Sequence, residues 1–226
     1  MGSDDLHHKR KARKGAELER QKRARSRSQR YLIVCEGSKT EPNYLRELVA
    51  DLGIRPQAVR IAPNDGCSPD RIVAHALALF DDDAASGDSF DRVFCVFDRD
   101  CHASFDAAVQ KIWGLHGAKK PKPFEAITSS PCFEFWLLLH FGLTEQAFYA
   151  AGKKSVCDTV IAELRKKPGF KAYGKGQRGI YALLKDKTQT AMDAARTIRS
   201  NARGNGQKDS LTHVDELIQA LQDLAR

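Results

Sequence analysis

Two short apolar runs, Tyr31–Cys35 and Arg92–Phe97, constrain the fold of this chain more than any other feature of its sequence. Both are rich in β-branched and aromatic residues without a polar alternation, which is typical of strands buried on both faces. Such strands occur in parallel sheets, because helices on either side are needed to cover both faces. The two runs therefore predict an α/β fold.

Helical patterns alternate with these strands along the first part of the chain. The first helix is expected to have Thr40 as its N-cap and to end at Gly53, with apolar residues recurring at helical spacing between them. Strands that alternate with helices imply parallel pairing and right-handed crossovers. The further elements expected by the same reasoning are strands at Ala58–Ala62 and Phe124–Thr128 and helices at Pro69–Asp82 and Ser104–Leu115.

The last part of the chain is expected to be mainly helical. A dense apolar run at Phe133–Phe141 precedes three amphipathic stretches, and flexible basic loops are expected at Lys166–Arg178 and Arg203–Lys208. We therefore predict a core over residues 31–130 and a helical C-terminal extension over residues 131–226 that packs on it, with a separate small subdomain as the alternative. The three amphipathic helices are expected at Ser155–Arg165, Ile180–Asn201 and Thr212–Leu224.

Positive charge is concentrated in residues 1–30, which hold eleven Lys and Arg against four Asp and Glu, a net charge of +7. The remaining residues carry only +1 of the total of +8. A disordered basic arm of this kind gains free energy by releasing counterions from a nucleic-acid backbone, although it can also be a solvated tail. The arm residues expected to contact nucleic acid are Arg23, Arg25, Arg27 and Arg30.

Other bulk features point to the cytoplasm. No apolar run approaches the roughly 20 residues that a membrane span requires, and the first thirty residues lack the apolar segment of a secretory signal. The six cysteines are widely spaced and form no Cys-x-x-Cys pair, so we expect reduced, buried thiols rather than disulfides or a zinc site. We predict a cytoplasmic protein with no membrane association.

Acidic residues follow directly after both strong strands. Glu36 comes after the first strand, and Asp98 and Asp100 come after the second. Ligand sites of parallel α/β sheets lie outside the carboxyl ends of the strands, and side chains two residues apart on a strand face the same way. If the strands are neighbours, the three carboxylates are expected to meet at one edge of the sheet.

Three converging carboxylates repel one another unless a cation lies among them, and hard oxygen ligands suit Mg²⁺ or Mn²⁺. Such ions polarise phosphoryl oxygens and activate water, so the pattern indicates phosphodiester chemistry. An Asp-x-Asp pair alone is weak support, because acids often cap the helix that follows a strand. Its combination with Glu36 at a second strand end is much more specific.

The residues at these positions resemble a known family. Cys35-Glu36-Gly37 with Thr40-Glu41 and Tyr44, followed by Phe97-Asp98-Arg99-Asp100, resembles the Toprim domain of primases, topoisomerases and OLD-type nucleases. The run Ser130-Pro131-Cys132-Phe133-Glu134-Phe135-Trp136 is similar to the RloB-like branch, which is associated with bacterial restriction and phage defence. The resemblance covers roughly residues 30 to 220.

The resemblance implies a Toprim-like sheet in which Glu36 is catalytic and Asp98 and Asp100 bind metal. It also implies a partner ATPase of the AAA or ABC type for some members of the family. A role in phage defence, including abortive infection, would follow from the same association.

Four further residues are candidates for the site. Glu134 opens the apolar run and would be costly to bury without a partner, so it is either a further metal ligand or an ion-paired capping residue. Lys39 is close to Glu36 in sequence, and Lys175 and Arg178 lie in a glycine-containing basic loop, so each is a candidate phosphate contact or an ordinary exposed residue. His140 is expected to be structural.

The sequence favours a Mg²⁺- or Mn²⁺-dependent endonuclease acting on DNA or on structured RNA such as tRNA. The chain is too short for a topoisomerase, lacks the accessory modules of a primase, and contains no P-loop motif. Two alternatives remain open. One is a non-catalytic nucleic-acid-binding or sensing subunit, and the other is a phosphohydrolase of the haloacid dehalogenase type, which also uses Asp-x-Asp after a strand.

Overall fold

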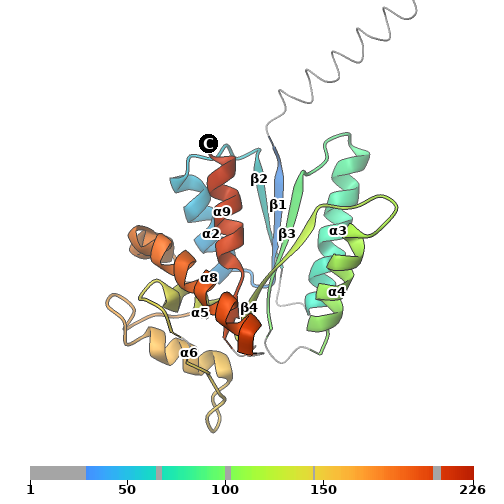
Figure 1. Ribbon diagram of the computed structural model, residues 1–226. Coiled ribbons are helices and arrows are strands. Elements are labelled where there is room, and N and C mark those ends of the chain that lie inside the picture. The colour runs from blue at the N-terminus through green and yellow to red at the C-terminus, as the bar shows by residue number, and fades with distance from the viewer. Residues whose placement is uncertain (1–28, 65–67, 100–102, 145, 206–209) are drawn as a thin grey trace, which may run out of the picture.

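The computed structural model describes residues 29–64, 68–99, 103–144, 146–205 and 210–226, with side chains left undescribed from residue 203 to 205. Within these ranges the protein has an α/β fold in which a mostly parallel five-stranded sheet lies between two groups of helices. Helices α3 and α4 cover one face of the sheet, and α2 and α9 cover the other (Figure 1). The predicted fold class is confirmed.

The strand order in the sheet is β2-β1-β3-β4-β5. The first four strands are mutually parallel, as predicted, and β1 lies between β2 and β3. The fifth strand is antiparallel to β4 and pairs with only the last two residues of β4. The strands span Tyr31–Cys35 (β1), Val59–Pro63 (β2), Arg92–Asp98 (β3), Phe124–Ser130 (β4) and Leu211–Thr212 (β5).

Nearly all predicted helices are present with shifts of a few residues at their ends. Helix α3 extends three residues beyond its predicted end, because the acidic run Asp81–Asp83 interrupts the apolar pattern before the helix ends. The helices are α2 (Thr40–Asp51), α3 (Pro69–Ala85), α4 (Phe105–His116), α5 (Glu134–Leu139), α6 (Val156–Leu164), α7 (Ile180–Leu184), the short 3₁₀ helix η1 (Lys185–Lys187), α8 (Thr188–Asn205) and α9 (Val214–Leu224).

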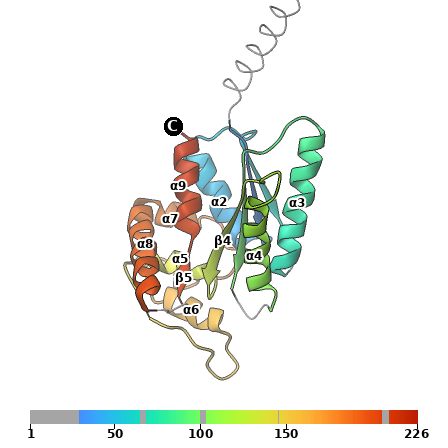
Figure 2. The same cartoon turned by 45° about the vertical axis from the view of Figure 1, so that its right-hand side comes forward.

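Two predictions for the C-terminal part were wrong in detail. The expected helix over Ile180–Asn201 is interrupted by η1, so that α7 and α8 are separate helices. The expected helix over Thr212–Leu224 begins only at Val214, because Leu211 and Thr212 form the antiparallel strand β5. Thus the C-terminal part contributes a strand to the sheet as well as the helices that pack on it (Figure 2).

The buried core is divided by the sheet into two clusters. Leu32 and Val34 of β1 pack against α3 and α4, whereas Ile33 and Cys35 pack against α2 and the C-terminal helices. All five residues of β1 are buried, which agrees with the reading of this run as a strand covered on both faces. None of the helices in the described ranges is long and apolar enough to cross a bilayer.

Candidate functional site

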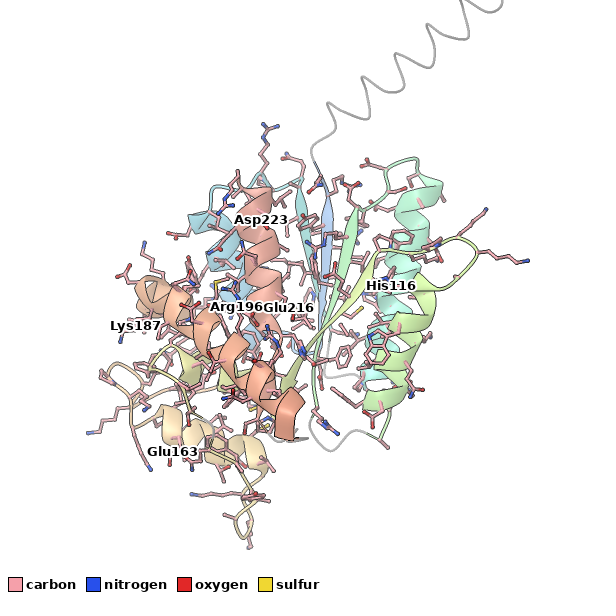
Figure 3. The ribbon with its side chains drawn as sticks, viewed as in Figure 1. His116, Glu163, Lys187, Arg196, Glu216 and Asp223 are labelled. Atoms are coloured by element: carbon pink, nitrogen blue, oxygen red, sulfur yellow. The ribbon has the colours of Figure 1, made fainter. Side chains whose placement is uncertain are left out.

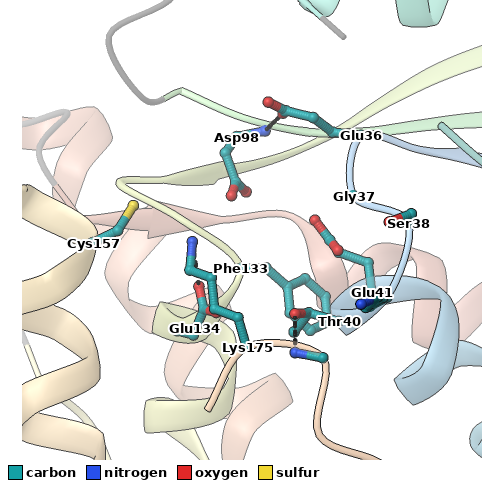
Figure 4. Close-up of a pocket in the computed structure, with 12 residues that line it drawn as sticks. Glu36, Gly37, Ser38, Thr40, Glu41, Asp98, Phe133, Glu134, Cys157 and Lys175 are labelled. Atoms are coloured by element: carbon teal, nitrogen blue, oxygen red, sulfur yellow. Dashed lines mark hydrogen bonds and ion pairs between the residues drawn. The ribbon is translucent and has the colours of Figure 1, made fainter. Parts of the chain in front are cut away.

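A pocket of about 380 Å³ opens at the carboxyl ends of β1 and β3, where a parallel α/β sheet is expected to bind its ligand. Its walls come from the loop after β1, the start of α2, the end of β3, the start of α5 and the loop before α7 (Figure 4). The charged residues that line the pocket are Glu36, Lys39, Glu41, Asp98, Glu134 and Lys175. Four carboxyl groups therefore share it with two ammonium groups.

Glu36 and Asp98 are brought together by the pairing of β1 with β3, in which Cys35 lies beside Val96. The ladder continues past β1, because the Glu36 backbone N–H donates to the Val96 carbonyl at 2.9 Å. The Asp98 backbone N–H in turn donates to Glu36 Oε2 at 2.9 Å. Figure 4 shows the Glu36 carboxylate against the backbone nitrogen of Asp98, while the Asp98 carboxyl group points into the pocket.

Asp98 is the centre of the acidic cluster. Its pKa is raised well above the ordinary range, first by burial and then by repulsion from Glu41, Glu134 and Glu36. A carboxyl group in this setting is held neutral by its surroundings unless positive charge is added. The prediction that Glu36 and Asp98 would share one edge of the sheet is met by their geometry, although they meet through backbone and side chain rather than carboxyl to carboxyl.

Glu41 is a member of the cluster that the sequence reading did not select. Its side chain is only 6% exposed, and its pKa is raised to about 7 by burial, with further contributions from Glu134 and Glu36. It lies against Gly37, where any Cβ would collide with the Glu41 carboxylate. The available signal was the Glu-Gly sequence one helical turn earlier, but an acid in the first turn of a helix is normally explained by the helix dipole.

Glu134 enters the pocket from the first residue of α5 and is almost completely buried. It is held by two neighbours, since the Tyr173 hydroxyl donates to Oε1 at 3.2 Å and the Lys175 Nζ lies 4.0 Å from Oε2. Burial opposes the charged form of Lys175, yet the pKa of Lys175 is raised overall, chiefly by Glu134. Lys175 therefore stays an ammonium ion beside the acids.

The loop that carries Lys175 is fastened to the start of α2. The Gly176 N–H donates to Thr40 Oγ1 at 2.9 Å, and Asn43 Nδ2 donates to the Gly176 carbonyl at 3.2 Å. A Cβ at Gly176, whose φ is +81°, would lie 2.9 Å from Lys39 Cβ. This loop was predicted to be flexible, but these contacts fix its position over the pocket.

The prediction that Thr40 is the N-cap of α2 was wrong. The N-cap of the helix is Lys39 rather than Thr40, and the cap makes no side-chain hydrogen bond. The Thr40 hydroxyl instead accepts a hydrogen bond from the loop that bears Lys175. The cause is a tertiary contact, because the side-chain hydroxyl of a Thr at a helix start can accept a hydrogen bond from the backbone N–H of another segment.

The remaining predicted contacts with nucleic acid are more scattered. Lys39 lines the pocket, and Arg178 is exposed on the same loop as Lys175. Arg30 lies at the opposite end of β1, where it pairs with Asp83 at 2.8 Å and stacks over Phe90 at 4.6 Å. Four predicted residues fall outside the described ranges, namely Arg23, Arg25, Arg27 and Asp100.

Two thiols stand beside the acidic cluster. Cys157 of α6 lines the pocket, and the Cys132 side chain hydrogen-bonds with it. The pKa of Cys132 is raised by this hydrogen bond and by burial. Within the described part of the chain the cysteines are free and buried, as expected, and they are Cys35, Cys95, Cys132 and Cys157.

His140 is buried behind the pocket, and its position agrees with the structural role expected for it. Its Nδ1 lies 3.1 Å from the Trp136 carbonyl, and its Nε2 lies 3.4 Å from the Tyr44 hydroxyl. Burial lowers the pKa of His140 to about 4, so the ring is neutral near pH 7. It is a core histidine whose ring nitrogens both have polar neighbours.

The oxygen donors of the pocket are of the type that a hard divalent ion binds. Among the residues that the structure describes, however, no three His, Cys, Asp or Glu side chains are already gathered closely enough to hold a metal ion. The pocket has more acidic than basic residues, and this composition is compatible with the binding of a cation. Binding would require the Glu41, Asp98 and Glu134 side chains to move toward one another.

A comparison with protein-family models shows the family to which the chain belongs. The model described as RloB-like protein matches residues 31–221. The chain belongs to this family. The match includes every described residue of the pocket, so the acidic cluster lies within the RloB-like region. Comparison with curated proteins and with solved structures found no match.

Proposed function

We propose that this RloB-like protein is a nuclease that uses Mg²⁺ or Mn²⁺ to hydrolyse phosphodiester bonds in DNA or structured RNA. One observation carries the proposal. Four acidic residues from three segments of the chain line one pocket at the carboxyl end of the sheet, and among the described residues two lysines line it with them. The acids are Glu36, Glu41, Asp98 and Glu134, and the cations are Lys39 and Lys175.

The electrostatics of the pocket support a bound cation. Asp98 and Glu41 have raised pKa values because they are buried beside other acids. Acids buried side by side repel one another unless a bound cation offsets the repulsion. Residues with perturbed pKa values cluster at functional sites. Asp98, Glu41 and Glu134 would hold the ion, and Asp100 is the further metal ligand that the family resemblance implies.

Each residue has a role that its position suggests. A bound divalent ion would polarise a phosphoryl oxygen and make water a stronger nucleophile at neutral pH. Lys175, held over Glu134 by its anchored loop, would bind a non-bridging phosphate oxygen. Glu36 would accept the proton of the attacking water, with the Asp98 backbone N–H keeping its carboxylate in place.

The biological setting is part of the proposal. The motifs around Glu36 and Asp98 resemble the Toprim domain, and family membership agrees with the similarity seen around Glu134. Together they support a role in defence against phage, in which an ATPase partner controls cleavage. The basic arm of residues 1–30 would contribute nucleic-acid affinity without sequence preference.

The test is cleavage by the purified protein of plasmid DNA, single-stranded DNA and total cellular RNA, each with Mg²⁺ and with Mn²⁺. We expect cleavage of at least one substrate, and a loss of about a hundredfold or more for both Asp98→Asn and Glu36→Gln. Asp223→Asn, a change on the exposed side of α9, is the matched control and should cleave at the wild-type rate.

The variants also separate the alternatives. A phosphohydrolase of the haloacid dehalogenase type would form an acyl-phosphate on Asp98 and would tolerate Glu36→Gln. A non-catalytic binding subunit would bind nucleic acid, tolerate both substitutions and lose affinity when residues 1–28 are removed. If no substrate is cleaved with either ion, with or without an ATPase partner, the nuclease proposal fails.

A further inference from the structure

Two thiols that have no part in the proposed function lie at the acidic pocket. Cys157 lines the pocket and is 5% exposed, whereas Cys132 is fully buried. The side chains of the two residues are joined by a hydrogen bond. They come from different segments, because Cys132 follows β4 and Cys157 lies in the first turn of α6. The pair therefore connects two elements that border the pocket.

The Cys157 sulfur is directed into the pocket. Figure 4 shows it on the side that faces Asp98. The start of α6 is fixed by a capping box, in which the Asp158 N–H donates to Ser155 Oγ at 3.1 Å and the Ser155 N–H donates to Asp158 Oδ2 at 2.9 Å. In Figure 3, α6 is marked by Glu163 and lies beyond the carboxyl ends of the strands. A small solute that enters the pocket would meet this sulfur.

Cys132 belongs to the turn that positions Glu134. Its backbone carbonyl accepts the Phe135 N–H at 3.0 Å, so Cys132 is held against the first turn of α5. Glu134, two residues later, is the acid that Tyr173 and Lys175 contact in the pocket. A covalent bond to the Cys132 sulfur would tie this turn to another element.

The other cysteines that the structure describes, Cys35 and Cys95, are arranged differently. They lie on the neighbouring strands β1 and β3, and both are fully buried. Their side chains point to opposite faces of the sheet, because Cys35 belongs to the core cluster on the α2 side and Cys95 to the cluster on the α3 side. Neither lines the pocket. Among the described cysteines, a hydrogen bond between two thiols is combined with access from the pocket only at Cys132 and Cys157.

We propose that Cys132 and Cys157 form a disulfide when the protein meets hydrogen peroxide, and that this bond switches the acidic pocket off. Peroxide is little larger than water, which occupies about 30 Å³ in the liquid, so a pocket of about 380 Å³ admits it. Cys157 reacts first, because its sulfur is the one that the pocket exposes. The effect on the pocket rests on the proposed nuclease function, whereas formation of the bond does not.

Peroxide is the only oxidant that the reaction needs. The Cys157 thiolate attacks one peroxide oxygen and the O–O bond breaks, which gives a sulfenic acid, and the released hydroxide takes up the proton lost by the thiol. The Cys132 sulfur then attacks the Cys157 sulfur, and the sulfenic hydroxyl leaves as water with the Cys132 proton. Two thiols thus lose two electrons and two protons, and one peroxide becomes two molecules of water.

The disulfide opposes the movement that cation binding requires. Glu134 has to move toward Asp98 and Glu41 before the three acids can share an ion. A disulfide bond of about 2.05 Å is shorter than the contact between two hydrogen-bonded thiols, so its formation draws the Cys132 turn toward α6. Figure 4 shows Cys157 and Glu41 on opposite sides of the pocket. The bond therefore pulls the turn that carries Glu134 away from Glu41.

Peptide mapping tests the bond. The full chain is treated with hydrogen peroxide, its remaining thiols are blocked, and the tryptic digest is analysed by mass spectrometry with and without reduction. The six cysteines fall in different tryptic peptides, so each pairing gives its own product. We expect the peptides of Cys132 and Cys157 to be joined, and Cys35 and Cys95 to stay free thiols. Any other product at Cys157, or no reaction there, overturns the proposal.

The cleavage assay measures the switch after the peroxide has been removed. Treatment should lower the cleavage rate of the wild-type protein by about tenfold or more, and dithiothreitol should restore it. Cys157→Ser should keep its own untreated rate, because the bond cannot form. Cys95→Ala, a change at a buried thiol away from the pocket, is the matched control and should lose as much as wild type.

The two proposals fail separately. If the disulfide forms and the wild-type cleavage rate is unchanged or increased, the switch is wrong and the nuclease proposal stands. If nothing is cleaved under any condition, the nuclease assignment is wrong, and the switch is judged by Mn²⁺ binding. The disulfide should weaken that binding by about tenfold, and an unchanged affinity would overturn the switch as well.

Discussion

Two groups of buried charge in this protein are built on opposite principles. On the C-terminal helices, Asp215 is almost fully buried, yet it is paired with Arg199, whose Nη2 donates to it at 2.7 Å, and has Arg196 at 3.7 Å. In the pocket at the end of β1 and β3, four carboxyl groups face two ammonium groups, of which Lys175 is 58% exposed.

The two groups differ in how their charges are balanced. The Asp215 group is balanced and hydrogen-bonded, so it can be permanently buried without needing anything from outside. The acidic pocket instead holds more carboxyl groups than ammonium groups, and the pKa values of Asp98 and Glu41 are raised by burial and by their acidic neighbours. Four measurements test this comparison.

The largest effect is expected from breaking the balanced group. Arg199→Ala would leave Asp215 buried without its main partner and should lower the free energy of unfolding by about 3–5 kcal/mol. Arg196→Ala, at a site with 45% of its side chain exposed, is the control and should cost about 1 kcal/mol or less. Urea unfolding of the two variants measures both values, and equal costs would mean that Asp215 does not depend on Arg199.

The second effect is stabilisation of the unbalanced group by a divalent ion. Mn²⁺ at about a hundred times its dissociation constant should raise the free energy of unfolding by about 2.7 kcal/mol, because it binds the folded state only. Asp98→Asn should lose most of this gain, and Arg196→Ala should keep it. A thermal melt with and without the ion gives the comparison, and an equal response of wild type and Asp98→Asn would contradict the cation site.

The third effect is a pH dependence that the unbalanced group alone should produce. The pKa of Glu41 is about 7 in the folded protein, against an ordinary value of 4.5. Between these values the folded state keeps a proton that the unfolded state releases, so the stability contributed by Glu41 is fully present below pH 4.5 and falls as pH rises to 7. We expect a loss on the order of 2–3 kcal/mol in metal-free protein.

Glu41→Gln isolates this slope, because a neutral amide does not titrate. The difference between the two proteins is the quantity to measure, since His140, with its pKa lowered to about 4, contributes stability that grows as pH rises toward 6.5. Parallel stability curves for wild type and Glu41→Gln would show that Glu41 is not held protonated.

The smallest effect concerns how the pocket positions its lysine. Thr40→Val keeps the shape of the side chain but removes the acceptor for the Gly176 N–H, at a cost of about 1 kcal/mol to the loop. Amide hydrogen exchange at Gly176 should become several times faster. The Gly179 N–H, which donates to Glu47 at 2.6 Å, is an internal control and should be unchanged.

The sequence was most informative where hydrophobicity was continuous. The uninterrupted apolar run of β1 was expected to be a strand covered on both faces, and this placed Glu36 correctly at its carboxyl end. The same reasoning placed Asp98 beside it, because parallel neighbours end at the same edge. Strand identity and site location thus followed from the same residues.

Other features could not be predicted because they depend on tertiary contacts. Strand β5 has two residues, too few for any alternation to appear, and it exists because it pairs with the end of β4. Glu41 looks like an ordinary first-turn acid until β3 and α5 bring other acids near it. The anchoring of the Lys175 loop depends on α2, more than a hundred residues earlier in the chain.

The margins of the sheet have a consequence for how copies of this protein behave together. At one side β2 is short, carries Arg60 and ends in Pro63, which has no N–H to give a neighbouring strand. At the other, His116 and His213 occupy carbonyls of β4. Folded proteins can aggregate by pairing exposed strand edges. Proteins whose edges are short or already hydrogen-bonded remain separate molecules at high concentration. Many copies can therefore be crowded together without joining their sheets.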